Sequence, residues 1–264
     1  MSDLQFIFRY INYKIFSKSK KGHDVHSPFV FDFIAKVLGN YATYKSQYIK
    51  NILSWHESLT KNKDKINICE IGAGSRKETK GSVKVNSLVK KTGIRPRYGQ
   101  LLWRILYYYK PEAVIEFGTG MGVSTAYLAG SLPDVKVHTV EGDAERLVFA
   151  QKEFRKLGLK NIIGYNENFD DFITKSNFKK NNYAIFLDGN HRQEPTIRYF
   201  NYFVNICDEN SFIILDDINW SGEMREAWKI IKDHPLVSIS IDLFFIGIVF
   251  FRKGIPKQGF VLNF

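Results

Sequence analysis

The stretch AVIEFGTGMGVSTAYLA, residues 113–129, decides the fold class of this chain. It opens with an apolar run, residues 113–117, passes through three closely spaced glycines, and ends in residues of helix-forming character. This order predicts a buried strand, a tight turn and a helix, the first half of a strand–helix–strand unit. Strand-like and helix-like segments keep alternating as far as residue 252, so we expect an α/β fold around a largely parallel sheet.

Outward from this stretch, apolar periodicity predicts the other elements. Strands are expected at residues 135–140, 161–165, 183–187 and 211–215. Helices are expected at residues 29–38, 98–109, 144–157, 196–206 and 223–232. The last two apolar runs, residues 237–245 and 248–252, are joined through Gly247 with too few residues for a crossover, so we expect an antiparallel hairpin.

The charge of the chain is divided unevenly along its length. The net charge is +11, yet residues 1–100 hold 19 Lys and Arg against 7 Asp and Glu, whereas residues 101–264 hold 19 against 20. We therefore expect a basic, mainly helical N-terminal extension over residues 1–97 and an α/β domain over residues 98–264.

The cysteine and hydropathy patterns limit the class of protein. Two cysteines occur, Cys69 and Cys207, and neither belongs to a C-x-x-C pair or a cluster with zinc spacing. No apolar run approaches the roughly 18 residues that cross a bilayer, and the first residues lack a signal-peptide pattern. These features predict a cytoplasmic protein without a transmembrane segment.

The glycine loop carries the first candidate site. Gly118, Gly120 and Gly122 follow the strand, and Glu116 lies two residues before the first glycine. Glycines let the backbone turn sharply and approach a ligand closely. The spacing G-x-G-x-G departs from the G-x-G-x-x-G of dinucleotide sites, because the third glycine comes one residue early. A tight turn without a ligand is the alternative.

Glu141 strengthens the ligand interpretation, because it ends the next strand, where a carboxylate can accept hydrogen bonds from both hydroxyls of a ribose. A solvated strand end is the alternative for Glu141. A second stretch, residues 68–75, imitates the loop with Gly72 and Gly74 but lacks a third glycine. We interpret this second stretch as a structural turn.

Four segments together resemble a known family: VIEFGTGMGVSTAYLA, VEGD, FLDGNH and ILDDINW. They are similar to class I S-adenosylmethionine-dependent methyltransferases, in the small-molecule O-methyltransferase branch that includes catechol O-methyltransferase. The resemblance covers about residues 98–252 and implies a doubly wound, seven-stranded, Rossmann-like sheet with the terminal hairpin. Residues 23–31, HDVHSPFVF, resemble an uncharacterised group of bacterial proteins, mainly from Bacteroidetes.

The resemblance implies a role for each candidate residue of the cofactor site. The methionine part of S-adenosylmethionine would be lined by Glu116, Gly118, Gly120 and Gly122. Glu141 would hold the ribose, and Asn168 and Phe169 would flank the adenine. Asp188, at the end of the fourth strand, would take part in both cofactor binding and catalysis.

The resemblance also implies a metal and a base. Asp188, Asp216 and Asp217 match the positions where metal-dependent relatives bind a divalent ion, and Mg²⁺ suits all-oxygen ligands. Ile218 follows Asp217 where catechol-type enzymes carry Asn, so this position departs from the metal-dependent pattern; helix capping by Asp216 and Asp217 is the alternative. His191 lies three residues after Asp188, where relatives place a Lys base, and histidine titrates near neutrality. A structural role for His191 is the alternative.

These features favour O-methylation of a small hydroxylated acceptor. Two alternatives stay open. The basic extension is compatible with an RNA methyltransferase that tracks phosphates. FIFRYINYKIFSKSKK, residues 6–21, is compatible with a catalytically inactive methyltransferase fold that binds a partner or an anionic membrane surface. The sequence also leaves a homodimer open.

Overall fold

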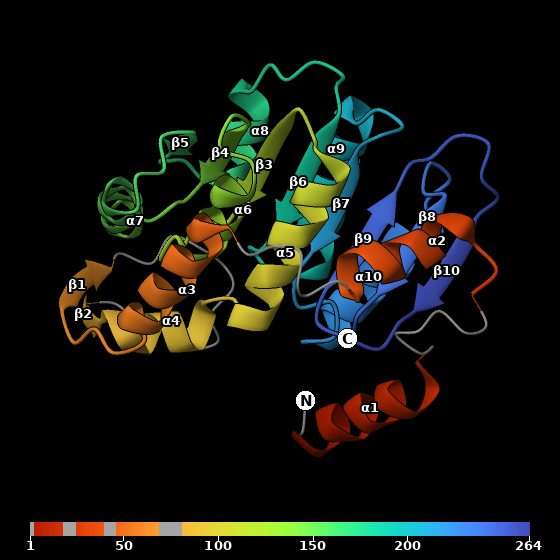
Figure 1. The fold of residues 1–264 in the computed structure, drawn as a ribbon, viewed down its shortest axis with the longest axis horizontal. Helices are drawn as coiled ribbons and strands as arrows, with labels where there is room; N and C mark the ends of the chain where they lie inside the picture. The colour runs from red at the N-terminus through yellow and green to blue at the C-terminus, as the bar shows by residue number, and fades with distance from the viewer. Residues whose placement is uncertain (1–2, 18–24, 40–45, 69–80) are drawn as a thin grey trace. The chain divides into compact units, whose positions relative to one another are not determined.

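The computed structural model describes residues 3–17, 25–39, 46–68 and 81–264 and has a mixed α/β fold (Figure 1). The chain divides into two compact units, one of residues 42–177 and one of residues 1–41 together with 178–264. Each unit is described by itself below.

The unit of residues 42–177 contains three parallel strands in the order β3-β4-β5. Their bounds are β3 (Ala113–Phe117), β4 (Lys136–Val140) and β5 (Ile162–Tyr165). The helices that connect and follow them are α6 (Val123–Ser131), α7 (Ala144–Lys156) and α8 (Phe169–Lys175). Parallel strands need such crossovers, which is why the strand and helix patterns alternate in the sequence.

Helix α6 is buried along its whole length because other helices cover it. The covering helices are α3 (Gln47–Leu59) and α5 (Pro96–Tyr109). Gly99 of α5 allows the ring of Tyr127 on α6 to approach closely, and the hydroxyl of Tyr127 lies 3.1 Å from Nδ1 of His56 on α3. A small antiparallel pair, β1 (Lys65–Ile68) and β2 (Gly81–Lys84), leads into α4 (Val85–Thr92).

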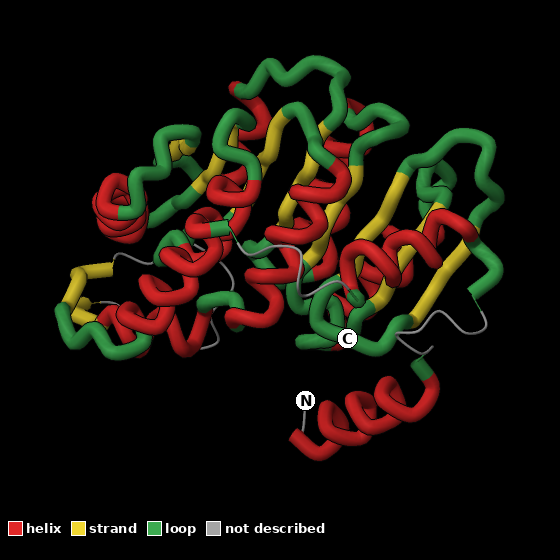
Figure 2. The backbone as a smooth tube through the Cα atoms, viewed as in Figure 1, coloured by secondary structure: helices red, strands yellow, loops and turns green. Residues whose placement is uncertain are grey.

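The second unit contains five strands in the order β10-β8-β9-β7-β6 (Figure 2). They are β6 (Tyr183–Leu187), β7 (Phe212–Leu215), β8 (Ile239–Asp242), β9 (Gly247–Phe250) and β10 (Gln258–Val261). β6 pairs with β7 in parallel, whereas β9 is antiparallel to both β7 and β8. The edge strand β10 is parallel to β8. Helices α9 (Gln193–Ile206) and α10 (Gly222–Asp233) follow β6 and β7.

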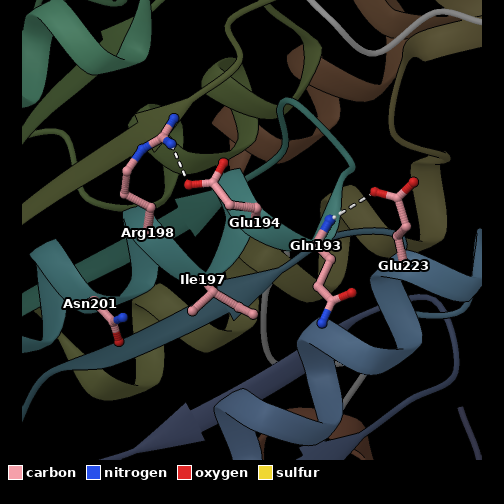
Figure 3. A pocket seen from close by; sticks show the side chains of 6 residues that line it. All are labelled: Gln193, Glu194, Ile197, Arg198, Asn201 and Glu223. Atoms are coloured by element: carbon pink, nitrogen blue, oxygen red, sulfur yellow. Dashed lines mark hydrogen bonds and ion pairs between the residues drawn. The ribbon is translucent and has the colours of Figure 1, made fainter.

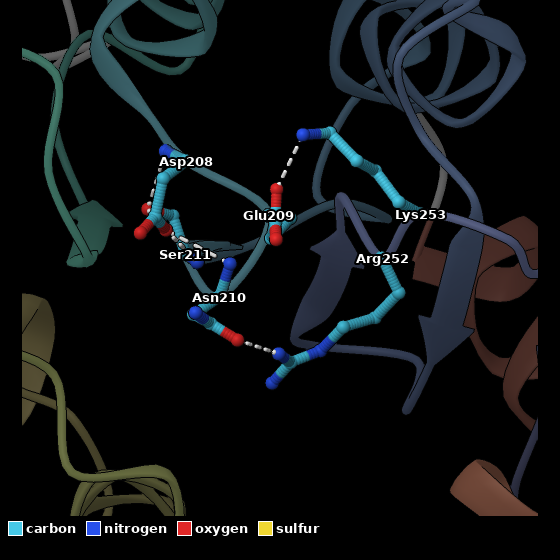
Figure 4. Close-up of polar contacts among 6 residues, drawn as sticks. All are labelled: Asp208, Glu209, Asn210, Ser211, Arg252 and Lys253. Atoms are coloured by element: carbon cyan, nitrogen blue, oxygen red, sulfur yellow. Dashed lines mark hydrogen bonds and ion pairs between the residues drawn. The ribbon is translucent and has the colours of Figure 1, made fainter.

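The N-terminal elements of this unit are α1 (Asp3–Phe16), α2 (Pro28–Phe33) and a π-helix, Ile34–Leu38. Phe29 and Phe33 meet the ring of Phe250 edge-on, which ties α2 to β9. At the start of β7, a turn is closed by the carboxylate of Asp208, which accepts from the amides of Asn210 and Ser211 (Figure 4).

Most of the elements expected of residues 98–252 are confirmed, and β3 and β6 have the predicted bounds. The terminal hairpin is antiparallel, as predicted. Beyond the expected seven strands, the described residues contain β1, β2 and β10, and helices α1, α3, α4 and α8 were not predicted either. The second glycine stretch, around Gly72 and Gly74, lies outside the described residues.

The boundary at residue 97 stays a prediction. Within the described residues, no helix is both long and apolar enough to cross a membrane.

We expect Gly99→Ala to destabilise the fold although alanine favours helices by about 1 kcal/mol. The added Cβ would lie 2.4 Å from the ring of Tyr127, which is fully buried. Overpacking of this kind costs about 1–3 kcal/mol of unfolding free energy, measurable by urea denaturation. Gly222→Ala is the control, because its Cβ would have no atom nearer than 3.6 Å. Equal effects of the two substitutions would contradict the packing account.

Candidate cofactor and catalytic sites

The three glycines of the loop between β3 and α6 all have left-handed backbone conformations, with φ of 107° at Gly118, 52° at Gly120 and 81° at Gly122. Their surroundings differ. A Cβ at Gly122 would lie 2.6 Å from the ring of Phe154, so this glycine is needed for packing. A Cβ at Gly120 would meet nothing within 4 Å. Gly120 is therefore the position of the loop that a ligand can approach.

Glu116 lies beneath this loop and is fully buried. The hydroxyls of Thr125 on α6 and Thr139 on β4 both donate to its Oε2. Its Oε1 is buried without a well-formed hydrogen bond to any described residue. Burial raises the pKa of Glu116 to about 6, although the hydroxyl donors oppose the shift. Among the described residues, no Lys, Arg or His side chain forms an ion pair with this carboxylate. An unpaired buried carboxylate favours a positively charged ligand.

Glu141, directly after β4, is tied to the same loop. Its Oε2 accepts from the amide of Gly120 at 2.8 Å, and its Oε1 accepts from the amide of Asp143 at 3.0 Å. Burial raises its pKa. Each carboxylate oxygen can accept a second hydrogen bond, so Glu141 keeps the capacity to hold two hydroxyls.

Asn168 and Phe169 begin α8. The side chain of Asn168 is exposed and caps the helix, because its Oδ1 accepts from the amide of Asp171 at 2.8 Å. Phe169 stacks on Phe117, with ring centroids 4.6 Å apart and planes 8° from parallel. Phe169 therefore offers a half-buried flat apolar surface, whereas the oxygen of Asn168 is already engaged by the helix.

These groups are supported by further residues that were not among the candidates from sequence. Thr125 and Thr139 hold Glu116, and Asp143 caps α7 by accepting from the amides of Glu145 and Arg146. The D of the quoted VEGD segment was the available signal for Asp143, since Asp is a preferred N-cap residue. No local pattern marks the two threonines, because their shared target lies on another strand or helix.

In the second unit, the structure brings together the four remaining candidates. Asp188 follows β6, and Nε2 of His191 lies 3.7 Å from its Oδ1. Asp216 follows β7 and shares a hydrogen bond with Asp188. Burial and the charge of Asp217 raise the pKa of Asp216 to about 8. Burial lowers the pKa of His191, while the charge of Asp217 opposes that shift.

The backbone of this cluster has unusual conformations. Asn190 and Asp217 have φ of 53° and 54°, in the left-handed region that costs energy for residues other than glycine. Such residues concentrate at functional sites, where the surrounding structure holds them in place. Asn219 lies one position later than the Asn of catechol-type enzymes. Its side chain donates to the carbonyl of Phe244 at 2.8 Å and so stabilises the backbone of the neighbouring turn.

Both groups of residues lie in a segment that is similar to known proteins. Residues 115–218 match the family model described as a methyltransferase domain. Over this segment the chain is therefore similar to methyltransferases, and its mixed α/β sheet has the Rossmann-like methyltransferase fold. The matched segment runs from β3 to the residues after β7 and includes both candidate groups. A search of curated proteins finds no match.

Solved structures share the fold of the methyltransferase domain. The O-methyltransferase TomG of Streptomyces achromogenes, involved in tomaymycin synthesis and solved with S-adenosylmethionine, has a TM-score of 0.54 at 15% identity, over 61% of this chain and 82% of its own. An O-methyltransferase of Bacillus cereus, solved with S-adenosylhomocysteine, has a TM-score of 0.54 at 16% identity, over 81% and 94%. The methyltransferase PaMTH1 of Podospora anserina has 0.54 at 12%, over 79% and 89%.

The expected Mg²⁺ site at Asp188, Asp216 and Asp217 is not supported. Among the residues that the structure describes, no three His, Cys, Asp or Glu side chains are arranged to hold a metal ion. Burial and the charge of Asp217 raise the pKa of Asp216, which favours its protonated form and limits the repulsion among these carboxylates.

A groove of about 530 Å³ lies beside the first turns of α9 and α10 (Figure 3). The amide of Gln193 donates to Glu223 across it at 3.2 Å, and Glu194 pairs with Arg198. Its lining begins two residues after His191 in the chain.

We expect Thr139→Val to destabilise the domain by about 1.5–3 kcal/mol at pH 8, because a buried charged acceptor loses a donor. Burial raises the pKa of Glu116 in the folded state to about 6, above its value in the unfolded chain. The contribution of Glu116 to stability is therefore fully present below the unfolded-state pKa and is lost as the pH rises through about 6. The loss of unfolding free energy should therefore be smaller at pH 5, where Glu116 is protonated. Urea denaturation at both pH values measures the difference.

Thr174→Val serves as the control for this substitution, because the hydroxyl of Thr174 is exposed and bonds only its own helix. We expect an effect within about 0.5 kcal/mol at either pH. A pH-independent effect of Thr139→Val would mean that the hydroxyl does not serve the ionised form of Glu116.

Proposed function

We propose that this protein is a cytoplasmic S-adenosylmethionine-dependent methyltransferase that methylates a hydroxyl oxygen of a small molecule. The observation that carries the proposal is the buried, unneutralised carboxylate of Glu116 beneath a left-handed glycine loop, which Glu141 ties to the next strand. S-adenosylmethionine carries a sulfonium and an ammonium group, so it brings the positive charge that this environment favours.

The residues of this unit fit the parts of the cofactor. Gly120 leaves open space beside the loop, where a bulky or charged side chain would obstruct a ligand. Glu141 has acceptor capacity for the two ribose hydroxyls. Phe169 presents a flat ring, and rings of this kind stack favourably on aromatic bases. When bound, the cofactor supplies an activated methyl group, so the protein has to orient an acceptor and remove a proton.

His191 is suited to remove that proton. Burial lowers its pKa, so the imidazole is neutral at physiological pH and can accept a proton. Asp188, with Oδ1 3.7 Å from Nε2, would stabilise the imidazolium that results. A hydroxyl needs such a base before it becomes a good nucleophile, which supports an oxygen acceptor.

Cofactor binding is tested by Gly120→Arg. Gly120 and Gly158 share a left-handed φ and open surroundings, so arginine strains both backbones to a similar degree. We expect the wild type and Gly158→Arg to bind S-adenosylmethionine with micromolar affinity in calorimetry. Gly120→Arg should remain folded but bind at least about tenfold more weakly, because the side chain fills the space beside the loop.

Circular dichroism and thermal melting of both variants establish that they fold. Absence of binding by the folded wild type would refute the proposed cofactor. Equal weakening in the two variants would mean that backbone strain, and not occupation of the site, accounts for the loss.

Catalysis is tested by release of S-adenosylhomocysteine in the presence of a panel of hydroxylated aromatic compounds. We expect His191→Ala to lower kcat by about 10²–10⁴-fold, with cofactor affinity unchanged. Because a base acts only when neutral, the wild-type rate should fall as the pH drops through the lowered pKa of His191, and the variant should lack this limb. His234→Ala, at the end of α10, is the control and should keep the wild-type profile. A retained acidic limb in His191→Ala would exclude His191 as the base.

A further inference from the structure

Helix α1 is fixed to its unit by one side only. The rings of Phe6, Tyr10 and Tyr13 lie 5.4, 5.0 and 5.1 Å from the ring of Phe244. The hydroxyl of Tyr13 donates to the carbonyl of Leu262, and Nζ of Lys14 donates to Oδ1 of Asn263 at 2.8 Å. These contacts anchor the helix beside the C-terminal residues and determine which side of it remains free.

The remaining side of α1 is apolar and exposed. We name Ile7, Phe8, Ile11 and Ile15 the α1 outer face; their exposed fractions range from 49% to 66%, and Phe16 at the helix end is exposed by 79%. Positions 7, 11 and 15 recur every four residues, so they share one side of the helix, with Phe8 beside them. Large apolar side chains that gather on a surface in this way mark an interaction site.

The charge around the outer face is strongly positive. Residues 1–22 contain five Lys or Arg and one acidic residue, Asp3. Arg9 belongs to α1 itself, and the guanidinium of Arg225 on α10 lies near enough to Arg9 to lower its pKa further, after burial. The sequence continues after the helix as Ser-Lys-Ser-Lys-Lys. An apolar helix face within a basic segment matches the chemistry of an anionic lipid surface.

A second copy of the chain fits this face less well. In a symmetric dimer the same face meets itself, so the two basic segments would lie close together and repel each other. A stable dimer also buries about 800 Å² on each partner, which is more than four or five half-exposed side chains of one helix provide. Charge complementarity and size therefore both favour a bilayer.

We propose that the α1 outer face docks this methyltransferase on the surface of a bilayer rich in anionic phospholipid. The isoleucines and Phe8 would enter the boundary between headgroups and acyl chains, while the basic residues contact lipid phosphates. The opposite side of α1 stays packed on Phe244, so the rest of the unit is held at the membrane without a spanning helix.

Vesicle co-sedimentation of the full chain, without cofactor, tests this proposal. We expect wild-type protein to sediment with vesicles of equal parts phosphatidylcholine and phosphatidylglycerol but not with pure phosphatidylcholine. Ile11→Ser combined with Ile15→Ser should weaken this binding about tenfold or more, because two apolar anchors are lost. Ile230→Ser combined with Leu236→Ser is the matched control, since these residues are similarly exposed in the same unit but belong to α10 and the turn after it.

Salt and oligomeric state complete the test. Binding should fall in about 1 M salt, where charges are screened beyond about 3 Å. The proposal is overturned if the wild type does not bind the anionic vesicles, or if the α1 variant binds as well as the wild type. It is also overturned if sedimentation velocity finds a wild-type dimer that the α1 variant converts to monomer, because the outer face would then belong to a second copy.

Discussion

The structure around the glycine loop depends on one buried carboxylate. Glu116 on β3 receives hydroxyl donors from Thr125 on α6 and Thr139 on β4, so a single side chain links a strand, the next strand and the helix between them. Without these donors a charge in this position would be too costly to bury. The glycine loop runs over this carboxylate, and Glu141 holds the loop from its other side through the amide of Gly120. The conformation of the loop is therefore set before any ligand arrives.

In the second unit, three carboxylates lie close together. Asp188, Asp216 and Asp217 come together at the ends of two parallel strands, where burial and the charge of Asp217 raise the pKa of Asp216. In the same cluster, Nε2 of His191 lies 3.7 Å from Oδ1 of Asp188. The left-handed backbone of Asn190 and Asp217 indicates that the chain accepts local strain to place these groups.

Strong local patterns made much of the fold predictable. The apolar runs of β3 and β6 are buried and continuous, and glycines or acidic residues end them sharply, so their bounds could be derived from sequence. Short or exposed elements were missed. Helix α8 is seven residues long, and β10 alternates half-buried and exposed residues at the edge of the sheet, so neither leaves a strong periodic signal.

The α/β class, the glycine loop and the acidic residues that end the strands could be derived from sequence, because these depend on the order and spacing of residues along the chain. Tertiary contacts were needed to show that Gly122 serves packing while Gly120 faces open space, that Glu116 is fully buried, and that Asp216 is hydrogen-bonded to Asp188. It also divided α1 into a packed side and an exposed one. The physical reason is that burial, close approach and shared protons depend on residues far apart in sequence, whose distances no local pattern records.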